Sequence, residues 1–329
     1  MNLKISVIGS GAWGTAIANL IAKNSFAVSL FAHSQEVVLE INKKRTNQKY
    51  LPKIKLSSKI LAVKDLSEPN LQGSDLVFIV TPSQTVEDIL KEISAFKLNT
   101  KTGFVICSKG LDQDKLKFFS QVFEEFLPNR KFAILSGPNF ALEVAQEVPT
   151  ITTIASKDKK FAQKIIKVLQ NNYFQAHYSD DPITTEIAAV LKNVIAIGCG
   201  IVDGLNLGQN AKAALLNQGV QEILLLCKKL KGSGNLNNAA GFGDIFLTCS
   251  TTKSRNNALG YEIAKGRSFK EIDAKAHKTF EGAISVKSIV RLAKKMKLQL
   301  KLCETIEEIL NKNFSIKEIK EKITKAILE

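Results

Sequence analysis

Three glycines near the N-terminus have the spacing of a phosphate-binding turn. Gly9, Gly11 and Gly14 form the pattern G-x-G-x-x-G. The pattern directly follows the apolar run Lys4–Ile8 and precedes the helical stretch Thr15–Lys23. Between a strand and a helix, such glycines permit a tight turn and let the backbone approach a diphosphate, which then binds N–H groups at the positive end of the helix. The pattern therefore predicts a dinucleotide-binding segment.

The end of the second apolar run, Ala27–Ala32, indicates which dinucleotide binds. Sites for NAD usually carry an Asp or Glu about 20 residues after the glycines, where the carboxylate binds the ribose hydroxyls. Residues 31–35 read Phe-Ala-His-Ser-Gln, and no acid occurs before Glu36. Nothing there would repel a 2′-phosphate, and His33 could contact one. We therefore expect NADP to be accepted, with NAD not excluded; the alternative for His33 is a surface loop position.

A nicotinamide dinucleotide transfers a hydride. Hydride transfer to a carbonyl leaves an alkoxide, so the chain also needs a proton donor. His177 falls in a strand pattern and His277 lies far along the chain, so both are expected to be structural. Lys192 stands in the apolar stretch Ile187–Ile197, which predicts a buried helix. Burial lowers the pKa of an ammonium group toward neutrality, as a general acid and base requires. The alternative is a lysine whose amine extends to solvent.

A group of oxyanion-binding side chains follows the segment Gly241–Asp244. Ser254, Arg255 and Asn256 offer hydroxyl, guanidinium and amide donors in succession. This combination suits a phosphate or a polyhydroxyl substrate, since arginine can hold an oxyanion through two parallel hydrogen bonds. A loop cluster without a ligand is the alternative interpretation.

Two further turns lie where predicted strands end. Lys109 follows the apolar run 103–107, and Gly137 and Asn139 follow the run 132–135. Ligands of open α/β sheets bind beyond the carboxyl ends of the strands. We therefore expect Lys109 to supply a positive charge to a ligand, and Gly137 and Asn139 to bring backbone and amide groups close to it.

The elements that must position these groups fall into two patterns. Up to about residue 185, short apolar runs alternate with helical stretches, which predicts a parallel sheet with helices on both faces. The candidate strands are 4–8, 27–32, 60–63, 76–81, 103–107, 132–135, 151–155 and 174–178, and helices between them include 84–96, 114–126 and 159–169. Beyond residue 185 we expect helices at 186–201, 211–228, 257–265, 283–295 and 315–327, with glycine-rich loops at 198–208 and 232–243. The prediction is an α/β protein, with a Rossmann-type doubly wound domain over residues 1–185 and an all-helical domain over residues 186–329.

Composition favours a cytoplasmic enzyme. The 329 residues carry a net charge of +15, but nearly all the excess is lysine spread along the chain, which indicates a solvated surface rather than a nucleic-acid site. The five cysteines are scattered without a Cys-x-x-Cys pair, so neither a disulfide framework nor a metal site is expected. No signal peptide is recognised, and no run approaches the roughly 18–20 uncharged apolar residues of a membrane span.

The motifs together closely resemble those of the bacterial NAD(P)-dependent glycerol-3-phosphate dehydrogenases. They occur in the family's order at residues 9–14, 108–111, 136–141, 191–200, 240–244 with 248–249, 254–256 and 281–282. The resemblance extends from the N-terminus to about residue 285. It implies reversible reduction of dihydroxyacetone phosphate to sn-glycerol 3-phosphate, which supplies phospholipid synthesis, and a Rossmann domain followed by a helical domain.

The resemblance also implies roles for individual residues. Lys192 matches the family's proton-transferring lysine. The positions that match substrate contacts are Lys109, Gly137, Asn139, Asp244, Ser254, Arg255 and Asn256. The positions that match cofactor contacts are Ala12, Trp13, His33, Ala141, Thr279 and Glu281, together with Lys109 and Arg255. Two departures stand out: Ala189 and Val190 replace the family's frequent Gly-Ala, and Asn139 replaces its usual Ser or Thr.

Two other functions fit parts of the pattern. A β-hydroxyacid dehydrogenase of the 6-phosphogluconate type also joins a Rossmann domain to a helical one and uses a lysine, but it predicts a carboxylate substrate and lacks the order Ser254-Arg255-Asn256. A non-catalytic dinucleotide-binding regulator would use the positive charge and predicts salt-sensitive nucleic-acid binding. We expect a small phosphorylated substrate, no nucleic-acid partner, no membrane insertion and, by analogy, a homodimer.

Overall fold

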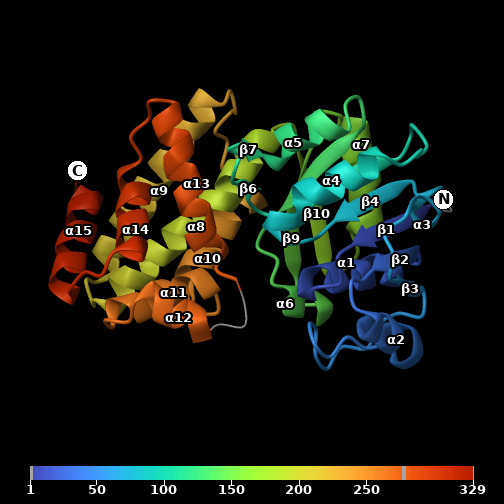
Figure 1. The fold of residues 1–329 in the computed structure, drawn as a ribbon, viewed down its shortest axis with the longest axis horizontal. Helices are drawn as coiled ribbons and strands as arrows, with labels where there is room; N and C mark the ends of the chain where they lie inside the picture. The colour runs from blue at the N-terminus through green and yellow to red at the C-terminus, as the bar shows by residue number, and fades with distance from the viewer. Residues whose placement is uncertain (1–2, 276–278, 329) are drawn as a thin grey trace. The chain divides into compact units, whose positions relative to one another are not determined.

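The computed structural model describes residues 3–275 and 279–328, which fall into two compact units (Figure 1). The first, here called the sheet unit, contains the chain up to Ser108 and the segment Phe119–Pro182. The second, the helical unit, contains Lys109–Phe118 and the chain from Ile183 onward. The segment that carries Lys109 is therefore part of the helical unit, although it lies between two strands of the sheet in the sequence.

The sheet unit contains all eight predicted strands. They form one sheet in the order β10-β9-β8-β5-β4-β1-β2-β3. Central strands such as β4 and β5 are buried on both faces, which explains why their sequences are continuous apolar runs. The strands are β1 (Lys4–Ile8), β2 (Ala27–Phe31), β3 (Ile60–Val63), β4 (Leu76–Ile79), β5 (Gly103–Ile106), β8 (Phe132–Ser136), β9 (Thr150–Ala155) and β10 (Phe174–Ser179).

One strand pair departs from the predicted parallel sheet. β8 and β9 are antiparallel, with Leu135 opposite Ile154, while the other pairs of this sheet are parallel. A parallel neighbour needs a crossover that carries the chain back over the sheet. The connection between β8 and β9 contains only the five-residue helix α6 (Ala141–Ala145), so β9 returns beside β8. Apolar runs alone do not encode strand direction, and the sequence could not reveal this reversal.

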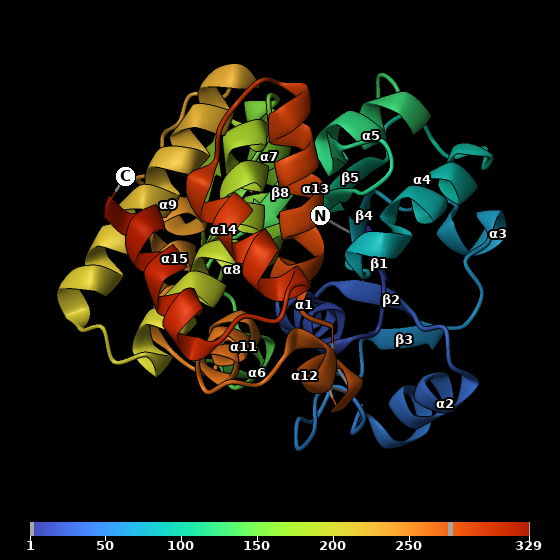
Figure 2. The same cartoon turned by 60° about the vertical axis from the view of Figure 1, so that its left-hand side comes forward.

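Helices cover both faces of the sheet, as a doubly wound fold requires (Figure 2). One core packs α1, α2 and α7 against strand residues such as Val7, and the other packs α3, α4 and α5 against residues such as Ile79. The predicted helix 114–126 begins only at residue 119, because the chain before it forms the short strand β7 (Lys117–Phe118). The helices are α1 (Ala12–Lys23), α2 (Gln35–Lys44), α3 (Glu68–Leu71), α4 (Val86–Ser94), α5 (Phe119–Phe126) and α7 (Lys159–Leu169), with the 3-10 turn η1 (Ser83–Thr85).

Helices make up the described chain beyond residue 185, as predicted. The helical unit also contains the hairpin of β6 (Leu111–Asp112) and β7 (Lys117–Phe118) and the π-helical turn η2 (Ala239–Gly243). Three helices that the sequence did not predict, α10, α12 and α14, belong to it. Its helices are α8 (Pro182–Gly204), α9 (Gln209–Lys229), α10 (Asp244–Ser250), α11 (Arg255–Ala264), α12 (Phe269–Lys275), α13 (Glu281–Lys295), α14 (Lys301–Asn311) and α15 (Ile316–Leu328).

The glycines of α8 serve helix packing, so the predicted loop from residue 198 to residue 208 is wrong over most of its length. α8 continues to Gly204. A Cβ on Gly200 would lie 2.0 Å from the carbonyl oxygen of Asn257, and a Cβ on Gly260 would lie 1.9 Å from that of Ile197. The backbones of α8 and α11 approach so closely that only glycine fits at these crossings.

α8 is the central helix of its unit, and the other helices surround it in both views (Figures 1 and 2). By length and overall hydropathy it could cross a membrane, although Glu186, Lys192 and Asp203 interrupt its apolar sequence. However, 94% of its most apolar window is buried inside the protein. Burial of this kind is typical of the core helix of a globular unit, and it places the middle of α8 in an environment that excludes water.

The start of α14 depends on a distant carboxylate. Its N-cap, Leu300, offers no side-chain cap, but the buried Glu222 of α9 accepts hydrogen bonds from the backbone N–H groups of Leu302 (2.6 Å) and Cys303 (3.1 Å). The two oxygens thus satisfy donors that a helix leaves unpaired at its start.

Glu222→Ala is expected to destabilise the helical unit, because both buried N–H groups lose their acceptor, at a cost of about 1–3 kcal/mol each. Urea unfolding followed by circular dichroism measures the change. The exposed Glu321, changed to alanine, is the control and should remain within about 0.5 kcal/mol of the unmodified chain. Equal stability of the two variants would contradict the capping role.

Candidate active site

α8 and α10 bring a buried amine and a buried carboxylate together. The Lys192 amine donates hydrogen bonds to Oδ1 of Asp244 (2.9 Å) and to Oγ1 of Thr248 (2.7 Å). Only 7% of the Lys192 side chain and 2% of the Asp244 side chain are exposed. The expected buried position of Lys192 is confirmed, and the alternative in which its amine extends to solvent is wrong.

The same carboxylate binds a second lysine. The Lys109 amine donates to Oδ2 of Asp244 at 2.7 Å, and its side chain is 25% exposed. Lys109 comes from the segment that enters the helical unit just before β6. One carboxylate thus lies between two ammonium groups, the inner one buried and the outer one accessible to solvent.

The electrostatics of this group favour proton transfer at Lys192. The pKa of Lys192 is lowered from its usual 10.5 to about 8. Burial is the main cause, and the positive charge of Lys109 acts in the same direction, while the negative charge of Asp244 opposes both. Burial alone would raise the pKa of Asp244, but the charges of Lys109 and Lys192 outweigh it, so that this pKa lies below its usual value. Near neutral pH, therefore, Asp244 stays ionised while Lys192 can exchange a proton.

The donor group Ser254–Asn256 is built into the start of α11. Ser254 caps this helix by accepting from the N–H of Asn257, and Asn256 accepts from the N–H of Gly282 (3.0 Å) at the start of α13. The Arg255 guanidinium donates to the carbonyl oxygen of Thr279 (2.9 Å). Ser254 and Asn256 are buried, and they belong to the start of a helix rather than to a loop.

Two helix N-termini and the buried lysine adjoin one another. A Cβ on Gly282 would lie 2.6 Å from the carbonyl oxygen of Asn193 and 2.9 Å from Oδ1 of Asn256. The start of α13 therefore packs between α11 and the turn of α8 that carries Lys192. Because helix N-termini attract anions, this arrangement provides a positive environment for a phosphate near the Lys192 amine.

Thr248 is a member of the group around Lys192 and Asp244 that reasoning from residue chemistry missed. Thr248 lies one turn after Asp244 on α10, and its hydroxyl donates to the carbonyl oxygen of Asp244 (2.6 Å) while accepting from Lys192. The spacing of four residues was the available signal, because residues i and i+4 share a helix face.

The glycine turn of the sheet unit has the form of a diphosphate cradle. Gly9 has a φ of +111°, and a Cβ there would lie 2.4 Å from the carbonyl oxygen of Val80. A Cβ on Gly14 would lie 1.9 Å from that of Gly9, whereas a Cβ on Gly11 would meet nothing within 4 Å. α1 begins at Ala12 without a side-chain cap. The turn therefore leaves open space beside Gly11, at the start of a helix, where a diphosphate fits.

Alanine at Gly14 and at Gly11 should have different effects. Gly14→Ala must displace the turn itself, and we expect it to lower both thermal stability and dinucleotide affinity. Gly11 has a φ of −64°, which alanine tolerates, so Gly11→Ala should keep its melting temperature but weaken dinucleotide binding about tenfold or more, because the methyl group occupies the space open to the diphosphate. Calorimetric titration and thermal unfolding separate the two effects. Unchanged affinity in Gly11→Ala would contradict the cradle.

The other predicted residues of the sheet unit lie near the turn or near β9. Trp13 and Ala141 pack on one small cluster that joins α1 to α6, and His33 lies exposed just beyond β2. The amide of Asn139 binds β9: it donates to the carbonyl oxygen of Ile151 (3.0 Å) and accepts from Thr152 (2.9 Å).

The remaining predicted positions lie in turns or at a helix start. A Cβ on Gly137 would lie 3.0 Å from Cα of Thr152, so this glycine also permits close packing. In the helical unit, Thr279 and Glu281 flank the start of α13. His277 lies outside the described residues. The ligand contacts of these residues remain predictions.

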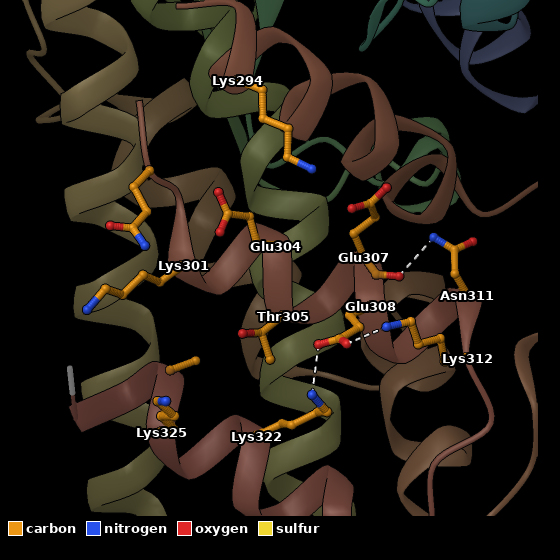
Figure 3. Close-up of a pocket in the computed structure, with 12 residues that line it drawn as sticks. Lys294, Lys301, Glu304, Thr305, Glu307, Glu308, Asn311, Lys312, Lys322 and Lys325 are labelled. Atoms are coloured by element: carbon orange, nitrogen blue, oxygen red, sulfur yellow. Dashed lines mark hydrogen bonds and ion pairs between the residues drawn. The ribbon is translucent and has the colours of Figure 1, made fainter. Parts of the chain in front are cut away.

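A separate open cavity of about 720 Å³ lies on the helical unit between α14 and α15 (Figure 3). Its lining mixes lysines with glutamates, and Glu308 binds both Lys312 (2.7 Å) and Lys322 (2.8 Å). These ion pairs hold the pKa of Glu308 at about 2. No predicted site residue lines this cavity, whose lining contains five lysines and three glutamates. Over residues 3–275 and 279–328, no group of three or more His, Cys, Asp or Glu side chains is placed to hold a metal ion.

A Rossmann-type sheet with a diphosphate cradle, in one chain with a helical unit that buries a lysine against a carboxylate, defines the class of nicotinamide-dependent dehydrogenases. Comparison with known families specifies the member. Residues 4–162 match the family described as NAD-dependent glycerol-3-phosphate dehydrogenase N-terminus, and residues 181–321 match the corresponding C-terminus. The chain belongs to the NAD-dependent glycerol-3-phosphate dehydrogenase family.

Individual relatives agree with this assignment. The glycerol-3-phosphate dehydrogenase [NAD(P)+] of Citrifermentans bemidjiense is 37% identical over 319 residues, which cover 96% of this chain and 95% of that protein. The crystal structure of glycerol-3-phosphate dehydrogenase from Coxiella burnetii has a TM-score of 0.92 at 29% identity and covers 99% of both chains. That of Plasmodium falciparum has a TM-score of 0.89 at 28% identity, covering 97% of this chain and 94% of its own. The predicted fold class and family are confirmed.

Proposed function

We propose that the chain interconverts dihydroxyacetone phosphate and sn-glycerol 3-phosphate with NADP(H) or NAD(H), and that Lys192 is the proton donor and acceptor. The observation that carries the proposal is the buried Lys192 amine, held by Asp244 and Thr248 with a pKa of about 8. A group with this pKa is effective both as an acid and as a base near neutral pH.

The residues of the sheet unit fit a nicotinamide dinucleotide. Gly9, Gly11 and Gly14, with Ala12 and Trp13, would hold the diphosphate at the start of α1. His33, beyond β2, would face the adenosine ribose, where a 2′-phosphate distinguishes NADP from NAD. When bound, the nicotinamide supplies or accepts the hydride. The roles inferred for Lys109, Ala141, Arg255, Thr279 and Glu281 toward the cofactor rest on the family resemblance.

The helical unit would bind the substrate and manage its charge. Arg255 and the N-terminal ends of α11 and α13 suit the phosphate, because they offer a guanidinium and oriented N–H groups. As the C2 oxygen of the ketone gains negative charge, Lys192 donates a proton to it; in the reverse direction Lys192 removes that proton from the alcohol. Asp244 stays ionised and orients the Lys192 amine, and Lys109 balances its second oxygen.

We further propose a cytoplasmic, homodimeric enzyme that supplies glycerol 3-phosphate for phospholipid synthesis. Two phenylalanines support self-association: Phe242 and Phe246 are 70% and 61% exposed and stack with their ring centroids 6.3 Å apart. They lie in the segment 232–252, which contains neither lysine nor arginine in a chain of net charge +15. A second copy could approach this surface without strong charge repulsion. Light scattering would reveal a mass near twice the chain's 36.1 kDa.

The first experiment follows NADPH absorbance after dihydroxyacetone phosphate is added to the purified chain. We expect a decrease that depends on enzyme and substrate, and a slower or absent decrease with 3-oxo acids. Turnover of a 3-hydroxy acid such as 6-phosphogluconate instead would favour the β-hydroxyacid type. Absence of turnover together with salt-sensitive nucleic-acid binding would favour the regulator.

A further inference from the structure

Asn47 is fully buried beside the glycine turn although the proposed function gives it no role. Its side-chain Nδ2 donates to the carbonyl oxygen of Ser10 (2.9 Å) and to Oγ1 of Thr15 (2.8 Å). Ser10 is the residue between Gly9 and Gly11, and Thr15 lies in the first turn of α1. A side chain from a loop beyond α2 thus reaches the residues that shape the diphosphate cradle.

The two donors fix the orientation of one peptide group. The Ser10 carbonyl also accepts from Oγ1 of Thr15 at 3.1 Å, so two buried side chains hold it toward the interior. In a trans peptide, the carbonyl and the following N–H point in opposite directions. Anchoring the Ser10 carbonyl inward therefore aims the Gly11 N–H away from Asn47 and Thr15. Space beside Gly11 is open, because a Cβ there would meet nothing within 4 Å.

The loop that carries Asn47 is itself tied to α1. The Asn47 carbonyl accepts from the N–H of Leu51 (2.8 Å), and Leu51 packs with Ala16 and Trp13 of α1. Oδ1 of Asn47 is buried and has no hydrogen-bond partner among the described residues. A buried acceptor without a partner lowers the stability of the fold. A contribution to stability therefore does not by itself explain why an amide stands at this position. The two hydrogen bonds that Nδ2 donates instead determine the geometry of the turn.

We propose that Asn47 is a positioning residue for dinucleotide binding: it holds the Ser10–Gly11 peptide so that the Gly11 N–H faces the diphosphate. The inference rests on the proposed function, because it concerns the same cofactor. Thr15 is the second positioning residue, because its hydroxyl accepts a hydrogen bond from the Asn47 amide and donates one to the Ser10 carbonyl oxygen.

The test measures binding directly. Trp13, the only tryptophan of the chain, lies at the turn, so its fluorescence can report titration with NADPH. In Asn47→Ala we expect the dissociation constant for NADPH to rise about ten- to hundredfold, the loss for one misdirected hydrogen bond to a charged group. The KM for NADPH should rise in parallel, while kcat at saturating NADPH and the KM for dihydroxyacetone phosphate should change by less than about twofold. Thr15→Val should weaken binding and Thr15→Ser should restore it.

Asn42→Ala is the matched control. Asn42 also binds the backbone of the sheet unit through its amide, donating to and accepting from Ala62 (both 2.9 Å), but it does not bond to the turn. We expect this variant to lose stability, recorded as its melting temperature, without losing NADPH affinity. Equal affinity in Asn47→Ala and the unmodified chain, or an equal loss in Asn42→Ala, would overturn the positioning role. An unmodified chain that neither binds NADPH nor turns over would instead refute the proposed function.

Discussion

Replacing Lys192 by methionine should lower turnover of dihydroxyacetone phosphate by about 10²–10⁴-fold, the usual contribution of one acid or base. Methionine fills a similar volume in the apolar surroundings of α8 but cannot donate a proton. Asp244 would keep Lys109 as its partner at 2.7 Å, so the buried carboxylate is not left without a counter-charge. The chain should therefore fold, and the loss should appear in kcat more than in the affinity for NADPH.

Steady-state rates of NADPH oxidation, with circular dichroism and thermal unfolding of the same samples, check this expectation. Lys212→Met is a matched control, because Lys212 is a mostly buried lysine of the same unit that pairs with Asp203 at 2.7 Å. It should lose stability but retain turnover. A folded Lys192→Met variant with near-normal turnover would reject the assignment of the proton donor.

The parts of the fold that the sequence predicts are those encoded by local pattern. β4 and β5 are buried on both faces, so their apolar runs mark them as strands, and α7 matches its predicted range of 159–169 because Asp158 caps it locally. α14 was not predicted, because its start is stabilised by Glu222 from another helix rather than by a capping residue of its own. The antiparallel direction of β9 was not predicted for a similar reason, because it depends on the neighbouring strand β8 rather than on the sequence of β9 itself.

The candidate site shows the same division. Lys192 could be recognised from sequence because a lysine within an apolar helix conflicts with its surroundings, and such conflicts often mark function. The bridge from Lys109 to Lys192 through Asp244 could not be recognised from sequence, because Asp244 lies 135 residues from Lys109 and 52 residues from Lys192. Only the tertiary fold shows that one carboxylate holds both amines and that Thr248 completes the set.

The rate of reduction should depend on pH with the pKa of Lys192. Donation requires the protonated amine, so kcat/KM for dihydroxyacetone phosphate should be constant at low pH and fall as pH rises through about 8. Removal of a proton requires the neutral amine, so kcat/KM for glycerol 3-phosphate oxidation should rise through the same pH. Opposite limbs with a common pKa would identify one group that serves both directions.

Asp244→Asn tests whether that group is Lys192. The carboxylate raises the pKa of the amine, against burial and the charge of Lys109, which lower it. Removing the negative charge should move both limbs to lower pH, so that reduction at pH 8 falls more than reduction at pH 6. Asparagine keeps an oxygen that can accept from Lys192, and circular dichroism would verify that the variant folds. Limbs that stay in place would mean that another group titrates, since the pKa of a buried amine must respond when a counter-charge 2.9 Å away is removed.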